Sequence, residues 1–139
     1  MATRIIGKTK QAGFQIGARK TFPISIQQAW DFITSDKGIR LWLGNVKNFR
    51  FDTGHTYKTS DGATGEVRVV NFRENIRLTW QPPEWQHTST IQVRVIPSGR
   101  KSIISFHQEN LANASERAQM RLRWQRVLEE IETTLGGAK

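Results

Sequence analysis

The chain has 139 residues, a net charge of +9 and no cysteine. The absence of cysteine excludes disulfides, thiolate nucleophiles and thiolate metal sites, and it suits a reducing, cytoplasmic compartment. No apolar run approaches the ~20 residues of a membrane-spanning helix. We expect residues 1–12 to form a flexible basic N-terminus and residues 13–136 to form a single domain of ordinary size.

The N-terminal third of the chain predicts one strand followed by two short helices. Apolar residues alternate with polar or small residues over 14–22, which indicates a half-buried strand. Ser25 and Gln28 have the spacing of a capping box, and apolar residues with helical spacing follow, so the first helix is predicted over 25–34. The second helix, over 36–43, carries three further apolar residues on one side.

The middle of the chain changes to a period of two, which is typical of strands. A shift of parity between Val67–Val69 and Val70–Phe72 predicts a β-bulge, or a strand covered on both faces. Turn residues such as Asp61-Gly62 and Pro82-Pro83 separate the segments. Strands are predicted over residues 48–53, 55–59, 64–73, 75–81, 91–95 and 102–109.

Residues 113–135 predict one long amphipathic helix that begins after Asn113, its expected N-cap. Its apolar stripe consists of Met120, Trp124, Val127, Leu128, Ile131 and Leu135. Strands joined by short turns and followed by a long helix predict an α+β fold. In this fold a curved antiparallel sheet of about six to seven strands wraps around the helix. A gap between sheet and helix would form a cavity.

Several segments resemble one protein family. They are residues 22–34, 39–43, Arg77-Leu78-Thr79-Trp80, 102–111 with His107, and the Trp124, Leu128, Ile131 pattern. Over residues 13–135 the chain resembles the helix-grip fold of the START and birch-pollen-allergen superfamily (SRPBCC). The most similar branch is named after the C-terminal domain of the activator of the heat-shock-protein-ninety ATPase. The family usually has glycine just before the last tryptophan, where this chain has Arg123.

The residues favour a binding site over a catalytic one. His55, His87 and His107 lie on separate predicted elements, so no metal site is expected. Glu66 and Glu109 are the only strand carboxylates near possible pocket positions, and Glu66 is expected to face solvent. Ligand pockets are lined by aromatic residues with few polar groups. The predicted lining is Trp42, Phe51, Tyr57, Trp80, Phe106, His107 and Trp124, with Trp85 on a loop that could gate the mouth.

The leading hypothesis is non-enzymatic binding of a small hydrophobic molecule, a lipid or an aromatic compound, between the sheet and the C-terminal helix. The resemblance implies an alternative, a protein-interaction module that contacts a chaperone or another acidic protein. A further alternative is a cyclase- or hydrolase-like enzyme of the same superfamily. No catalytic residue, cofactor or metal is predicted. Nucleic acid is disfavoured as a partner because the positive charges are spread along the chain.

Overall fold

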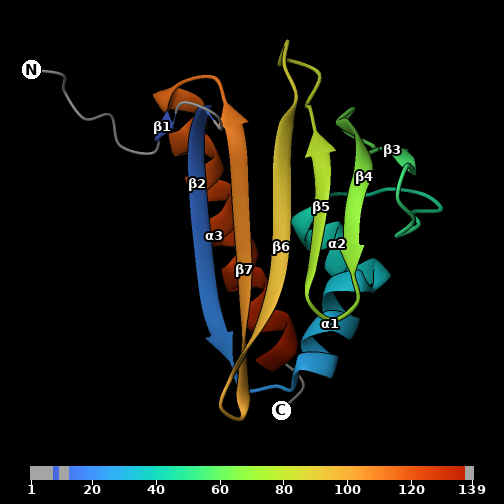
Figure 1. Ribbon diagram of the computed structural model, residues 1–139, viewed down its shortest axis with the longest axis vertical. Helices are drawn as coiled ribbons and strands as arrows, with labels where there is room; N and C mark the ends of the chain where they lie inside the picture. The colour runs from blue at the N-terminus through green and yellow to red at the C-terminus, as the bar shows by residue number, and fades with distance from the viewer. Residues whose placement is uncertain (1–7, 10–12, 137–139) are drawn as a thin grey trace, which may run out of the picture.

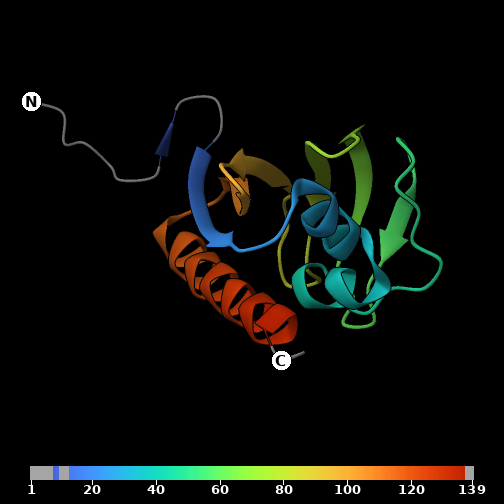
Figure 2. The same ribbon diagram turned by 90° about the horizontal axis from the view of Figure 1, so that it is seen from below.

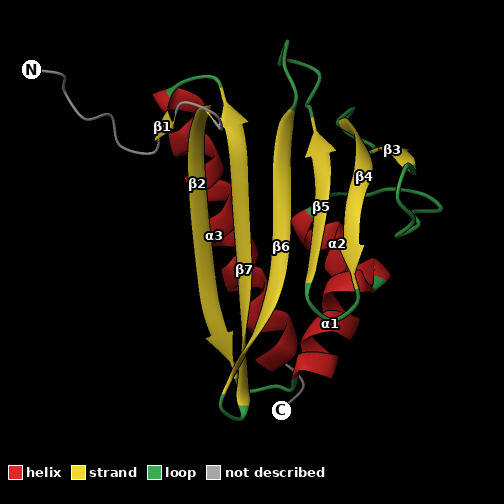
Figure 3. Cartoon of the chain, viewed as in Figure 1, coloured by secondary structure: helices red, strands yellow, loops and turns green. Residues whose placement is uncertain are grey.

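The structure, a computed structural model, describes residues 8–9 and 13–136. In the described chain, seven strands form one antiparallel sheet in the order β1-β2-β7-β6-β5-β4-β3 (Figures 1 and 3). The elements are β1 Lys8–Thr9, β2 Gly13–Phe22, α1 Ile26–Thr34, α2 Asp36–Trp42, β3 Thr56–Lys58, β4 Thr64–Asn71, β5 Asn75–Trp80, β6 Ser89–Ser98, β7 Lys101–Leu111 and α3 Ala114–Gly136. This is the predicted α+β helix-grip fold. Most of the predicted flexible start, residues 1–12, lies outside the described residues.

All three helices lie on one face of the sheet (Figure 2). Helix α3 runs along β2 and β7, and α1 and α2 cover the neighbouring part of the same face. The Ser25–Gln28 capping box forms as predicted and starts α1. The predicted irregularity in β4 is a register shift between Val67 and Val69. No described helix is both long enough and apolar enough to span a membrane.

The predicted strand over residues 48–53 is wrong, because this segment forms a loop without strand pairing. The alternation of Phe49 and Phe51 reflects contacts at the edge of the core instead. The Phe49 ring meets the rings of Phe51 and Tyr57 edge-on, at centroid distances of 4.9 and 5.6 Å. Asn48 has a positive φ of 54°, which turns the chain away from an extended path.

The core between sheet and helices is filled by large aromatic side chains. The rings of Phe106 and Trp124 are stacked, with centroids 4.7 Å apart, and Trp42 lies against Phe106 at 6.4 Å. All three side chains are fully buried. The indole N–H of Trp42 donates to the carbonyl of Ile33 at 2.9 Å, which joins α2 to α1.

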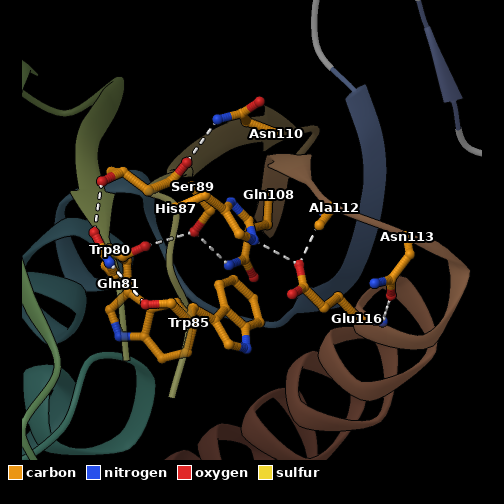
Figure 4. Close-up of polar contacts among 11 residues, drawn as sticks. Trp80, Gln81, Trp85, His87, Ser89, Gln108, Asn110, Ala112, Asn113 and Glu116 are labelled. Carbon is orange, nitrogen blue, oxygen red and sulfur yellow. Dashed lines mark hydrogen bonds and ion pairs between the residues drawn. The ribbon is translucent and has the colours of Figure 1, made fainter. Parts of the chain in front are cut away.

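A chain of buried hydrogen bonds crosses this core from α3 to β5. The indole Nε1 of Trp124 donates to Gln108 Oε1 at 3.0 Å, and Gln108 Nε2 donates to Ser89 Oγ at 2.9 Å. Ser89 Oγ donates in turn to the carbonyl of Trp80 at 2.7 Å (Figure 4). Each buried polar atom in this series of hydrogen bonds has a partner. The series therefore fixes the register of β5, β6 and β7 under the helix.

Candidate functional site

A groove opens where the space between sheet and helix reaches the surface. Its volume is about 520 Å³. The lining comes from the β3–β4 turn, the end of β5 with the loop that follows, and α3: Asp61, Trp80, Pro82, Pro83, Glu84, Gln119, Met120, Leu122, Arg123 and Arg126. Trp80 and Met120 also belong to the buried core. The groove is therefore continuous with the core rather than a surface hollow remote from it.

The loop between β5 and β6 forms one wall of the groove and is held by side-chain contacts. Pro82-Pro83 ends β5, since proline cannot donate to a strand ladder. The Trp85 ring meets Trp80 edge-on at 5.3 Å and stacks on the His87 ring at 5.0 Å. Trp85 is buried, so it forms part of the loop's packing.

The same loop is tied to the start of α3 (Figure 4). His87 Nε2 lies 2.8 Å from Glu116 Oε1, and the same oxygen accepts from the backbone N–H of Ala112 at 2.8 Å. The backbone N–H of Glu116 donates to Asn113 Oδ1 at 2.9 Å, which is the N-cap contact predicted for Asn113. One residue, Glu116, thus fixes both the helix start and the groove wall.

Arg123 is the charged centre of the groove lining. Its guanidinium carbon lies 4.8 Å from the centre of the Trp80 ring and 5.5 Å from that of Trp124. Its Nη2 donates to the carbonyls of Trp42 and Leu43, at 3.2 and 3.3 Å, at the C-terminal end of α2. Cations are favoured there because the last carbonyls of a helix carry partial negative charge. In the described chain Arg123 has no carboxylate within ion-pair distance.

Two donors in this lining have no hydrogen-bond partner among the described residues. They are Arg123 Nε and Trp80 Nε1, and both atoms are buried. Burial lowers the pKa of Arg123, while the charges of Asp61 and then Tyr57 act in the opposite direction. Burial raises the pKa of Tyr57, which donates its hydroxyl hydrogen to the carbonyl of Thr79. The lining therefore combines apolar side chains with two cations, two carboxylates and two buried N–H groups that have no partner among the described residues.

Five of the seven predicted lining residues come together in the core: Trp42, Tyr57, Trp80, Phe106 and Trp124. Of these five, only Trp80 also lines the groove. Phe51 is half-buried at the edge of the core. Ligand contact by any of them stays a prediction.

His107 lies on the opposite face of the sheet from Phe106, because neighbouring strand residues point to opposite sides. Its Nε2 lies 2.9 Å from Gln15 Oε1. Burial lowers the pKa of His107, Glu109 raises it, and Arg77 lowers it further. Its expected place beside the other lining residues is therefore corrected by the structure.

The predicted acidic candidates also lie away from the groove. Glu109 lies on the same face of the sheet as His107, and its Oε1 forms an ion pair with Arg77 Nη2 at 2.7 Å. Glu66 Oε2 lies 3.6 Å from Arg68 Nη1. Among residues 8–9 and 13–136, no three His, Asp or Glu side chains gather as a metal site would require.

Sequence reasoning missed most of the groove, above all Arg123. Arg123 lies outside the apolar stripe predicted for the long helix, yet its side chain folds back over two tryptophan rings. The available signal was its position directly before Trp124, where the family resembled usually has glycine. Arginine in place of glycine indicates that a long, charged side chain occupies space beside Trp124 that glycine would leave empty.

Comparisons with solved structures identify the fold. MLL2253 from Mesorhizobium loti superposes with a TM-score of 0.77 at 17% identity, covering 90% of this chain and 98% of that chain. PFC0360w, an HSP90 activator from Plasmodium falciparum, gives 0.69 at 18% identity, covering 88% and 96%. DynU16, from the dynemicin biosynthetic locus, gives 0.77 at 15% identity and covers 90% of this chain. This chain spans only 48% of DynU16.

A search of curated proteins found no significant match. The family model described as "Activator of Hsp90 ATPase homolog 1-like protein" matches residues 23–136, which include every element from α1 to α3. The chain therefore belongs to the family of Activator of Hsp90 ATPase homolog 1-like proteins.

Proposed function

We propose that the protein binds a small molecule with an apolar body in the groove beside Trp80, without catalysing a reaction. The observation that carries the proposal is the continuity of the groove with the core through Trp80 and Met120. Exposed Pro83 and Leu122 extend the apolar surface to solvent. An apolar ligand laid on these residues would gain roughly 25 cal/mol per Å² of apolar surface removed from water.

The packing of the core favours this groove over a deeper site. Phe106 and Trp124 are stacked and fully buried in the middle of the space between sheet and helix. A ligand at that position would have to separate them. At the groove, Leu122 is 64% exposed and is one of the large apolar side chains that the fold leaves in water.

The test is ligand binding with a matched pair of surface variants. Native mass spectrometry of the protein as purified from cells, followed by tryptophan fluorescence titration with lipids and aromatic compounds, should reveal a saturable ligand. Leu122→Gln should weaken its binding several-fold, because the side chain lines the groove. Phe72→Gln is the control, since Phe72 is similarly exposed at 68% but lies at the β4–β5 hairpin, beyond the other end of β5. Equal binding by both variants would contradict a site in the groove.

A second candidate function is docking to a chaperone of the heat-shock-protein-ninety class. Its support is the family to which the chain belongs and the likeness to PFC0360w. Exposed Arg121 and Arg126 on α3 could contact an acidic surface of such a partner. Arg121→Glu should abolish stimulation of the chaperone ATPase. Arg117 is a poor choice for the same test, because its Nε donates to the carbonyl of Gln15 at 2.9 Å and holds α3 to β2. Unchanged stimulation by Arg121→Glu would contradict docking through this face.

A further inference from the structure

The guanidinium of Arg123 has no carboxylate partner among the described residues to neutralise its charge. Burial of a cation is unfavourable unless a partner compensates it. Here the compensation comes from two aromatic faces and two carbonyls, and both carbonyl contacts exceed 3.1 Å. Asp61 is near enough to raise the pKa of Arg123 but not to pair with it. The arrangement holds a positive charge in a groove wall without cancelling it.

Trp80 presents the second half of the same arrangement. Its ring lies against the Arg123 guanidinium, and its Nε1–H has no acceptor among the described residues. Arg123 Nε is likewise without an acceptor. Two donors cannot satisfy each other, because neither nitrogen has a free lone pair. A ligand whose acceptor oxygens met both donors would satisfy them and would also neutralise the guanidinium if it were an anion.

The other charges of the lining limit which anion fits. Arg126 adds a second positive charge to the groove, whereas Asp61 and Glu84 add two negative ones. A group with a single negative charge, spread over two oxygens, gains from Arg123 with the least repulsion from the two carboxylates. A phosphate carrying nearly two charges would be repelled more strongly. Trp80, Met120, Leu122 and the two prolines offer apolar contact to the remainder of the molecule.

We propose that the ligand of this groove is an apolar carboxylic acid whose carboxylate accepts hydrogen bonds from Arg123 and from Trp80 Nε1. The inference rests on the proposed ligand-binding function and specifies its chemical class. Because both nitrogens are buried, the guanidinium must turn to meet the ligand. Its contacts with the α2 carbonyls, at 3.2 and 3.3 Å, are at the long end for hydrogen bonds and therefore release it easily.

The experiment compares acids with amides of the same carbon skeleton. Octanoate with octanamide, and 3-phenylpropionate with its amide, are titrated calorimetrically into the wild-type protein. Each acid should bind about tenfold or more tightly than its amide, as expected for a hydrogen bond to a charged group. Arg123→Gln should reduce the acid-to-amide ratio to near one. Trp80→Phe, which keeps an aromatic ring but lacks the N–H, should reduce it in part.

Asp61→Asn provides a variant with the opposite expected effect. Removing the negative charge near Arg123 should strengthen acid binding several-fold relative to amide binding and so raise the acid-to-amide ratio. The asparagine can still accept the hydrogen bond that Asp61 receives from Thr59. Because each ratio is measured within one variant, a general loss of stability does not imitate the expected pattern.

The outcomes separate the two levels of the proposal. Failure of both acids and both amides to bind would overturn ligand binding in the groove. Equal binding of acid and amide, or an acid preference that survives Arg123→Gln, would overturn the carboxylate inference while leaving the groove as a binding site. Displacement of the acids by inorganic phosphate at equal concentration would show a general anion site instead and would also overturn it.

Discussion

The rings of Trp80 and Trp124 both lie against the Arg123 guanidinium, yet their environments differ in one decisive respect. The Trp124 indole is fully buried and its N–H donates to Gln108 at 3.0 Å. The Trp80 indole is 4% exposed and its N–H has no partner in the described chain. A core residue satisfies its polar atoms within the fold, whereas a residue that lines a binding site can leave them for a ligand. The difference marks Trp124 as a residue of the core alone and Trp80 as a residue where the core meets the groove.

Truncating each tryptophan to alanine should separate the two regions most strongly. Trp124→Ala should lower the free energy of unfolding by about 3–5 kcal/mol, because it leaves a closed cavity beside Phe106 and an orphaned Gln108. Trp80→Ala should cost less, because its vacated space merges with the open groove. Urea denaturation of both variants measures the difference. A larger loss for Trp80→Ala would mean that Trp80 is the more important core residue.

Replacement by phenylalanine tests the hydrogen bond alone. Trp124→Phe removes the donor to Gln108 and leaves its buried Oε1 unsatisfied, which should cost about 1–3 kcal/mol beyond the loss of ring area. Trp80→Phe removes an N–H that has no partner, so only the loss of ring area remains. The same denaturation series provides the comparison. Equal losses in the two variants would show that Trp80 Nε1 is satisfied in solution.

The sequence predicted the core better than the site, for a physical reason. Burial of apolar residues follows the periods of strands and helices, so the stripe through Met120 and Trp124 could be read directly. Arg123 escaped that reasoning because a long, flexible side chain can place its charge far from the direction of its Cα–Cβ bond. The groove also joins residues from a turn, a loop and a helix, and their proximity depends on tertiary packing.

Two errors came from the way the two-residue alternation of strand side chains was used. Phe106 and His107 are neighbours on β7 and were both assigned to the lining, although strand geometry places them on opposite faces. The 48–53 segment shows the converse error. Phe49 and Phe51 alternate like strand residues, but alternation describes burial and does not supply a neighbouring strand for the backbone.

The surroundings of Trp80 also depend on Glu116, which contacts His87 in the β5–β6 loop. Glu116→Ala should lower stability by about 1 kcal/mol through loss of the capping contact at the start of α3. It should also free Trp85 from its place against Trp80. Thermal unfolding measures the first effect, and acrylamide quenching of tryptophan fluorescence measures the second. Unchanged quenching would mean that Trp85 and Trp80 hold the loop without this tie.

The smallest expected effect concerns His107, on the face of the sheet that the helices leave uncovered. Its folded-state pKa is lowered, first by burial and further by Arg77, with Glu109 acting in the opposite direction. The unfolded chain therefore binds the proton more readily, and stability should fall as pH decreases through about 6.5, the ordinary histidine value. Above that pH the contribution is fully present. His107→Asn should flatten this part of the stability curve, measured by urea denaturation between pH 7.5 and pH 5. An unchanged slope in His107→Asn would mean that other groups cause the pH dependence of stability. The difference in stability between the Trp80 and Trp124 variants should stay the same over this pH range, since neither indole titrates.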